Sequence, residues 1–356
     1  MQLTPEVKAQ LEEQKKQCVF CKIIKKEIQS KIVFEDGKTL GVLDIYPAVK
    51  GHTLYMLKEH YPIMPYLPVE DFTHLFGLLP QLSKAVKGAM VSIALNIFIA
   101  NGGAAGQQYP HFLIHLMPRD EGDNFFQFLF NRKEKKLAED KLKQLQMSLG
   151  QIMQNYFLSS SQEWHTGTGG RPGYLQGIES KGLVLYEDEK VLCLLPNLNI
   201  VAGHMELYSK LEERDIERLA IWDAVYLFTV GSFCASLLFQ IVGAQGTNLL
   251  VKSGITDDNR DGKLCVHILP RAQNDSLQGL HWEPKQPSYN IDRIMEKIKE
   301  KMWNVKFKVE AAGEKKTVTQ EKVSVTEKEE KVVEKEPEFL SAKDEIIRAI
   351  QKMQGK

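Results

Sequence analysis

Apolar residues along the chain fall into short runs and longer helical stripes that recur in one order. Residues 40–46 and 52–57 are apolar runs with the length of β-strands. Residues 69–91 carry apolar side chains at helical spacing, which predicts one long helix. Residues 96–100 and 111–117 are again strand-like, and the turn-rich NGGAAG separates them. The order strand, strand, long helix, strand, strand predicts an α+β domain.

The same pattern recurs 152 residues further along the chain, where His204 follows His52 and His267 follows His115 at this offset. The other recurring positions of the first copy are Glu35, Asp36, Leu40, Gly51, Lys58, Pro118 and Arg119. A single offset over such a span indicates a duplicated domain. Because His52 and His204 recur at the same strand position, a structural hydrogen-bonding role is favoured for them over metal ligation.

One segment, residues 224–244, carries no charge and has about the 20 residues that a membrane span needs. The repeat places it on the long helix of the second copy. We therefore interpret it as a buried core helix, with a membrane span as the alternative.

Changes in composition divide the chain into six parts. They are an N-terminal helical extension (1–17), the first unit (18–130), a connecting helix and flexible linker (131–173), a degenerate second unit (174–302), a charged disordered linker (303–337) and a C-terminal amphipathic helix (338–356). The last part is either a frayed surface helix or a peptide that docks on a protein partner or on the chain itself.

The charge balance and the cysteines argue against a nucleic-acid-binding, membrane-binding or disulfide-rich protein. The chain has 46 basic and 46 acidic residues, so no overall field attracts nucleic acid or an anionic membrane. Five unevenly spaced cysteines do not suggest a disulfide framework. We expect a cytoplasmic protein.

Cys18 and Cys21 form a CxxC motif at the start of the first unit. Two thiolates at this spacing can hold a tetrahedral Zn²⁺ if two more ligands converge. His60 follows the second predicted strand and His111 opens the last one, so the fold could bring both to the cysteines. Spacing alone leaves open the alternative of two unligated cysteines with His60 on the surface.

Two segments together resemble the histidine-triad (HIT) family. They are CVFCKIIKKEIQSKIVFEDGKTLGVLDIYPAVKGHTLYMLKEH, from Cys18, and GQQYPHFLIHLMPR, which ends at Arg119. The resemblance is strong over residues 18–123 and weak, through the repeat, over 183–271. It implies an α+β fold of two units, each a five-stranded antiparallel sheet with a long helix. Units of this family pair into one continuous sheet, so we expect an intramolecular pseudo-dimer, with a dimer of chains as the alternative.

The resemblance also implies a structural zinc ion in the first unit. Its ligands in the family map onto Cys18, Cys21, His60 and His111. The second copy has Gly170, Gly173, Glu212 and Lys263 at these positions, so no equivalent zinc is expected there.

The family's triad is His-x-His-x-His, and its middle imidazole attacks the α-phosphate of a nucleotide to form a nucleotidyl-histidine. Here His111 and His115 occupy the first and third positions, but the middle one is Leu113. A leucine has no lone pair, so it cannot act as nucleophile, acid or base. The second copy has Cys265 in the middle and His267 third. Either Cys265 is a buried inert cysteine or its thiolate, activated by His267, is a nucleophile.

The nucleoside end of the family's pocket is kept in the first unit. The residues that the resemblance places there are Asp44 at the ribose, Phe20, Ile23, Val42 and Ile45 around the base, and Asn101, Gln107 and His115 facing the phosphate. Plain core packing is the alternative for the four apolar residues. A carboxylate inside an apolar strand costs energy unless it is partnered, so a ribose or a backbone donor is expected at Asp44. The second copy has Pro196 at that position.

These observations favour a HIT-like protein that binds a purine nucleotide or nucleotide derivative without the family's usual turnover. One alternative is a nucleotide hydrolase or nucleotidyltransferase that acts through His115, Cys265 or a bound metal. The other is a protein-interaction module whose nucleotide pocket has closed, with the C-terminal segment as the working part. If Leu113 packs over His115, phosphate is excluded and the interaction module is favoured.

Overall fold

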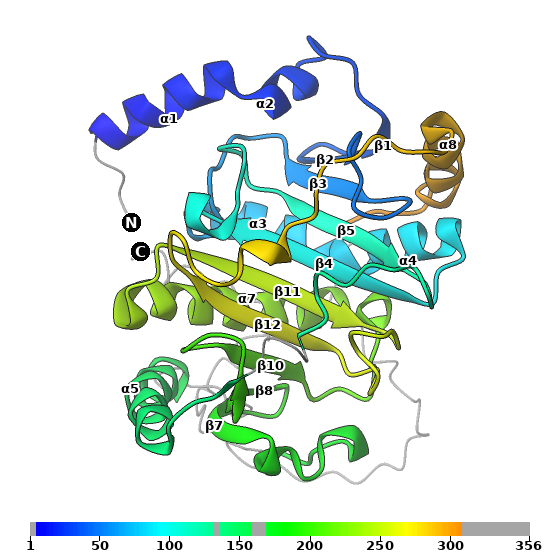
Figure 1. Ribbon diagram of the computed structural model, residues 1–356. Coiled ribbons are helices and arrows are strands. Elements are labelled where there is room, and N and C mark those ends of the chain that lie inside the picture. Colours follow the sequence, from blue (N-terminus) through cyan, green and yellow to red (C-terminus); the bar gives the residue numbers. More distant parts are fainter. Residues whose placement is uncertain (1–4, 131–134, 159–168, 308–356) are drawn as a thin grey trace, which may run out of the picture.

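The computed structural model describes residues 5–130, 135–158 and 169–307. The helix expected at 338–356 and most of the charged linker at 303–337 lie outside the described residues. We call residues 18–130 the first half and residues 169–307 the second half. Figure 1 shows that one sheet runs through both halves, with helices packed along it.

Ten antiparallel strands form this sheet in the order β1-β2-β3-β5-β4-β11-β12-β10-β8-β7 (Figure 1). The strands are β1 (Ile32–Glu35), β2 (Thr39–Leu43), β3 (Thr53–Leu57), β4 (Ala94–Asn101), β5 (Ile114–Arg119), β7 (Gly182–Glu187), β8 (Val191–Pro196), β10 (Met205–Ser209), β11 (Gly246–Ser253) and β12 (Cys265–Arg271). A separate ribbon pairs β6 (Lys135–Lys136) with β9 (Leu198–Asn199). Read outward from the centre, the two halves have the same strand order, as the 152-residue offset predicts.

The halves join because β4 and β11 pair along their length. The register runs from Leu95 opposite Ser253 to Asn101 opposite Thr247. All residues of both strands are buried, so this junction lies in the interior of the molecule.

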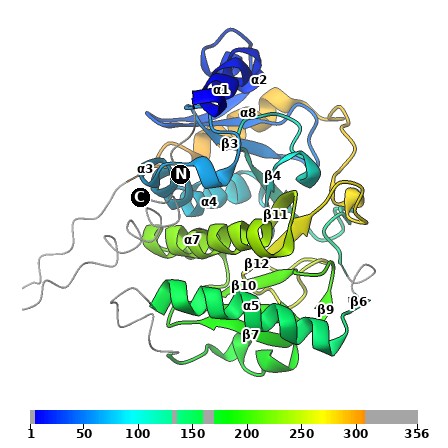
Figure 2. The same cartoon turned by 90° about the vertical axis from the view of Figure 1, so that its left-hand side faces the viewer.

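The helices are α1 (Pro5–Gln17), α2 (Val19–Ile24), α3 (Val69–Gly77), α4 (Leu79–Met90), α5 (Glu139–Leu158), α7 (Ile221–Leu237) with a π-helical end (Leu238–Val242), and α8 (Ile291–Lys301). In Figure 2, α1 and α2 lie at one end of the molecule and α5 lies near the other end, beside β7. Because side chains alternate along a strand, Ile97 and Ile99 of β4 join the large core beneath α3, α4 and α7. Phe98 and Ala100 join a second core on the opposite face.

The prediction of one continuous helix over residues 69–91 is wrong. Leu78 ends α3 and begins α4, so two helices cover this stretch. Pro80 has no backbone N–H and cannot extend the hydrogen bonds of α3, whereas its fixed φ suits the first turn of a new helix. The last strand also begins later than expected, at Ile114, so His111 lies in the loop before β5.

The uncharged segment forms α7 and its π-helical end. Ile221–Val242 is long and apolar enough to cross a membrane by length and composition, but 72% of its most apolar window is buried inside the protein. Phe228 of α7 stacks on Phe76 of α3, with ring centroids 4.6 Å apart. The interpretation as a buried core helix is therefore confirmed.

The segments that follow β5 and β12 each cross to the other half. Phe130 packs edge-on against His267 of the second half at 5.2 Å, and Trp282 packs edge-on against His115 of the first half at 5.4 Å. The two aromatic residues are themselves 152 residues apart. Each half therefore covers part of the other, which predicts that they unfold together.

We expect Phe228→Ala to lower the free energy of unfolding of the whole chain by about 3–5 kcal/mol, since it opens a cavity in the core shared by the two halves. Urea denaturation followed by far-UV circular dichroism measures this change. Ile255→Ala, at a residue 64% exposed, is the control and should change it by no more than about 0.5 kcal/mol. A variant in which only one half unfolds early would contradict the shared core.

Candidate functional site

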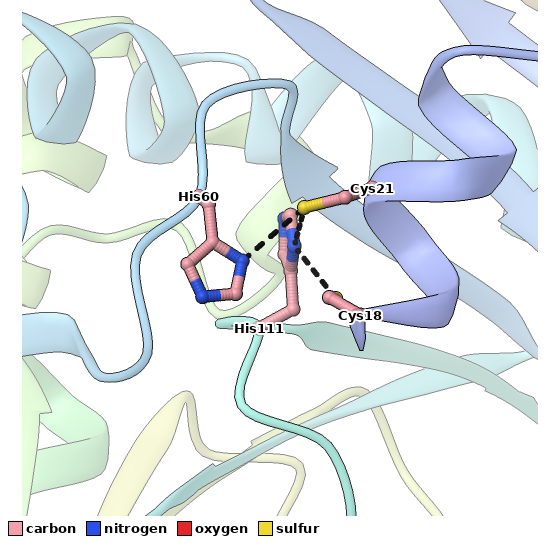
Figure 3. A group of neighbouring side chains, drawn as sticks. All are labelled: Cys18, Cys21, His60 and His111. Atoms are coloured by element: carbon pink, nitrogen blue, oxygen red, sulfur yellow. Dashed lines mark hydrogen bonds between the residues drawn. The ribbon is translucent and has the colours of Figure 1, made fainter. Parts of the chain in front are cut away.

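Two cysteines and two histidines of the first half converge on one point (Figure 3). Cys21 Sγ lies 3.2 Å from His60 Nδ1 and 3.7 Å from His111 Nδ1, and Cys18 Sγ lies 3.6 Å from His111 Nδ1. Cys18 and Cys21 bracket the first turn of α2, and both imidazoles come from loops beside strand ends. The four S and N atoms lie within 4.8 Å of one another, and such a set of donors could hold a tetrahedral zinc ion.

The tautomer of His111 suits metal binding. Its Nε2 lies 3.0 Å from the Leu57 carbonyl oxygen and must donate to it, so Nδ1 keeps a lone pair that points at the two sulfurs. Such a backbone contact is the usual support for a zinc-bound histidine. Burial and the neighbouring Cys18 raise the pKa of the Cys21 thiol to about 12. A cation among these four residues would reverse that shift, because it stabilises the thiolate.

A cavity of about 270 Å³ lies next to this cluster. Seven of the eight residues expected at a nucleotide line this cavity: Phe20, Ile23, Val42, Asp44, Ile45, Gln107 and His115. Leu113 also lines it. α2, β2 and the residues after β2 all contribute to its lining. The volume is near the lower bound of about 300 Å³ for small-molecule pockets.

Asn101, the eighth residue, is not among the residues that line this cavity. Its Oδ1 accepts from Met64 N and its Nδ2 donates to Thr247 Oγ1 of the second half, so the amide fixes backbone and the junction between the halves. Gln107 lines the cavity, but its amide also holds the surrounding loop. Its Oε1 accepts from Gly102 N, and its Nε2 donates to the carbonyl of Pro62.

Asp44 follows β2 and faces the cavity with its side chain 17% exposed. Its Oδ1 accepts from the backbone N–H of Tyr46 at 2.8 Å, which is the backbone donor that the sequence led us to expect. Its Oδ2 lies 3.5 Å from His52 Nδ1. Because that nitrogen already accepts from Ala48 N at 3.2 Å, it has no proton to give to Asp44. Burial raises the pKa of Asp44, since the charged form loses hydration.

The hydrogen bond from Ala48 N to His52 Nδ1 also determines which nitrogens of His52 and His115 carry a proton. His52 Nδ1 is an acceptor, so its Nε2 carries the proton and donates to His115 Nδ1 at 3.0 Å. His115 therefore holds its own proton on Nε2. Burial lowers the pKa of each imidazole to about 3, and both are neutral at physiological pH.

Comparison with known proteins decides the family. A protein-family model described as "HIT domain" matches residues 25–122 of the chain. An uncharacterized HIT-like protein of Methanocaldococcus jannaschii is 39% identical over 106 residues, which are 30% of this chain and 81% of that protein. The chain belongs to the HIT family.

Named HIT relatives act on adenylyl compounds. An adenosine 5'-monophosphoramidase of Saccharomyces cerevisiae is 37% identical over 29% of this chain and 64% of its own length. An adenylylsulfatase of Arabidopsis thaliana is 39% identical over 30% of this chain and 54% of its own length.

Among solved HIT structures, a family member from Bacillus subtilis is 36% identical and covers 31% of this chain and 77% of that one, with a TM-score of 0.30. A Zn-bound histidine triad family protein from Mycobacterium smegmatis is 31% identical and covers 31% and 81%, with a TM-score of 0.29.

Leu113, which the sequence resemblance places at the middle of the triad, borders the cavity. It packs beside Phe20 and Leu54 in the small core under α2, and it lines the same cavity as His115. The His111 side chain contacts the cysteines, whereas the His115 side chain contacts His52. Leu113 and His115 therefore border one open cavity.

Three residues of the second half, which the sequence did not point to, also line this cavity: His281, Trp282 and Pro284. Trp282 lies edge-on to His52 and His115, at 5.2 and 5.4 Å, and lines the cavity together with His281. The available signal was the 152-residue offset, which continues beyond Arg271 to Asp275. Arg271 bonds Asp275 as Arg119 bonds Asp123.

Cys265 and His267 are buried in the second half. Cys265 is 3% exposed, and burial together with the charge of Glu206 raises the pKa of its thiol well above the usual range. A thiol in this setting is not a nucleophile at neutral pH. His267 Nδ1 lies 3.1 Å from His204 Nε2, and burial lowers the pKa of His267 well below its usual value.

Buried neutral histidines make stability depend on pH. An unfolded histidine has a pKa of about 6.5, whereas His52 has one of about 3 when folded, so between these values the unfolded chain binds more protons. Its contribution is complete above pH 6.5 and is lost as the pH falls toward 3. We expect His52→Gln to reduce the slope of unfolding free energy against pH, between pH 6 and 4.5, by about 1.4 kcal/mol per pH unit. Equal slopes in urea titrations of the two proteins would contradict a neutral His52.

Proposed function

We propose that the first half binds a purine nucleotide or nucleotide derivative and does not form the covalent nucleotidyl intermediate. The observation that carries this proposal is the unshared oxygen of Asp44. Within the described part of the chain no donor bonds to Oδ2, which faces a cavity with apolar walls. A largely buried carboxylate is stabilised by hydrogen-bond donors, and a ribose hydroxyl can supply one to Oδ2.

The remaining walls fit a nucleoside. Phe20 and Ile23 of α2, together with Val42 and Ile45, give the cavity apolar surface on which a base can pack. The adenylyl compounds in the names of the relatives support a purine.

The charge around the cavity favours a ligand with few phosphate groups. No lysine or arginine is among the residues that line the cavity. His115 is neutral and offers only its Nε2 proton, so phosphate oxygens would depend on neutral donors such as this one. We therefore expect a nucleoside monophosphate or its derivative to bind better than a polyphosphate.

Leu113 removes the atom that would attack. Neither His115 nor Cys265 replaces it, because His115 Nδ1 is occupied by His52 and Cys265 is a buried thiol in the other half. The open cavity beside Leu113 favours a binder over a closed interaction module. The five buried free cysteines support a reducing compartment, such as the cytoplasm.

Restoring the imidazole tests this function. Wild type, Leu113→His and Leu113→Asn are incubated with adenosine phosphoramidate, and intact protein mass and products are followed by mass spectrometry. We expect a nucleotidyl adduct or product only with Leu113→His, because asparagine restores polarity but not a nucleophile. Turnover by the wild type would contradict a non-catalytic binder. Inactivity of all three, with no nucleotide bound, would contradict the nucleotide site itself.

We also propose that Cys18, Cys21, His60 and His111 hold a structural zinc ion, which joins α2 to the loops that border the cavity. We expect Cys21→Ser to bind one zinc fewer per chain than the wild type in elemental analysis. At free zinc of about 100 times the Kd, it should also lose about 2.7 kcal/mol of stability. Cys234→Ala, at a buried cysteine of α7 outside this cluster, is the control and should keep the zinc. Equal zinc contents in Cys21→Ser and wild type would refute the assignment.

A further inference from the structure

The second half holds a cluster of its own on the strands β10 and β12. His204 precedes β10, Glu206 lies on it, and His267 lies directly opposite Glu206 on β12. One ligand atom from each of the three lies within 4.8 Å of the other two. We propose that these three residues form a second site for a divalent transition metal ion such as Zn²⁺, separate from the cysteine cluster of the first half.

The separations match those of ligands on one ion. His267 Nδ1 lies 3.1 Å from His204 Nε2 and 3.6 Å from Glu206 Oε1. Two ligands held about 2.0–2.2 Å from zinc at a tetrahedral angle lie about 3.3–3.6 Å apart. Two imidazoles and one carboxylate are a common donor set for zinc and for iron.

The first half provides an internal comparison, since Asp44, His52 and His115 form a similar cluster. There the backbone N–H of Ala48 occupies His52 Nδ1, which forces the proton onto Nε2, between the two rings. No lone pair of His52 is then left for a cation.

The second half lacks this constraint. Within the described residues His204 Nδ1 is buried and has no hydrogen-bond partner. Nothing holds the proton of His204 on Nε2, so it can move to Nδ1 and leave a lone pair directed at His267. Without a cation, one proton must serve both the His204–His267 and the His267–Glu206 contacts. A metal ion satisfies all three atoms at once.

Glu206 is oriented for this role. The Tyr208 hydroxyl donates to its Oε2 at 2.6 Å, and its Oε1 lies 3.6 Å from His267 Nδ1. A hydrogen bond to the far oxygen is a typical outer contact of a metal-bound carboxylate. In the first half the position of Glu206 is Leu54, so the carboxylate is specific to the second half.

The positive charge of Lys252 disfavours a cation at this site. Together with burial, which is the larger cause, it lowers the pKa of both histidines. Its ammonium group, however, is held elsewhere. Nζ donates to the carbonyl oxygens of Phe128 and Asp258 and lies 4.1 Å above the Phe130 ring. Glu206 offsets part of this charge, so removing its negative charge should weaken the site strongly.

Cobalt distinguishes the two clusters, since thiolate ligands give Co²⁺ an intense charge-transfer absorption that nitrogen and oxygen ligands do not. The full chain is stripped of metal, titrated with Co²⁺ and followed by absorption and bound cobalt. We expect two ions per wild-type chain, only one with the thiolate band. Cys21→Ser should lose that band and keep the other ion.

Variants of the second cluster complete the test. Glu206→Gln and His267→Gln should each keep the thiolate band and bind the second ion at least about 100-fold more weakly, which exceeds the usual effect of an outer contact. His115→Gln, the matched change in the first half, should still bind two ions. One cobalt per wild-type chain, with the thiolate band, would overturn the proposal. So would an unchanged second affinity in Glu206→Gln, a mild change at a partly exposed residue that keeps an acceptor for Tyr208.

Discussion

The pairing of β4 with β11 is the interaction on which the rest of this molecule depends. It turns two five-stranded sheets into one of ten strands and buries both strands completely. It also brings the end of each half to the other half, so that Trp282 reaches His115 and Phe130 reaches His267. The ion pair between Arg119 and Asp258, each 1% exposed, adds a further link. Each half therefore supplies an aromatic residue that packs against the histidine pair of the other half.

The two halves share a scaffold but differ in the chemistry that it supports. Both place a histidine pair about 3 Å apart at the same strand positions. In the first half a backbone N–H fixes the protons of the pair, and Asp44 stands beside a cavity. In the second half no such donor fixes them, and Glu206 joins the pair. One backbone hydrogen bond and the position of one carboxylate thus separate the proposed nucleotide pocket from the proposed metal site.

Much of the fold follows from the sequence, because strand periodicity and the 152-residue offset are local signals that constrain both halves equally. They predict the order of strands and helices along each half and the buried α7. The gathering of Cys18 and Cys21 with two histidines was implied by the resemblance to the HIT family and not by periodicity. The break between α3 and α4 at Leu78 was not predicted because the apolar stripe continues through it, although Pro80 is a signal for a new helix. Trp282 could not be placed, because its partners lie across the junction of the halves and periodicity carries no such information. The amide of Asn101 was assigned to phosphate, but this junction uses it.

The central claim is that the first half is an intact nucleotide pocket without a nucleophile. The most direct measurement is titration calorimetry of the wild-type chain with adenosine monophosphate, with the nucleotide recovered and analysed afterwards. The account predicts saturable binding at one site per chain, unchanged nucleotide, and loss of binding in Asp44→Ala while the fold is retained. Absence of saturable binding by the folded wild type at millimolar nucleotide would contradict it, and the cavity at Asp44 would then need another ligand.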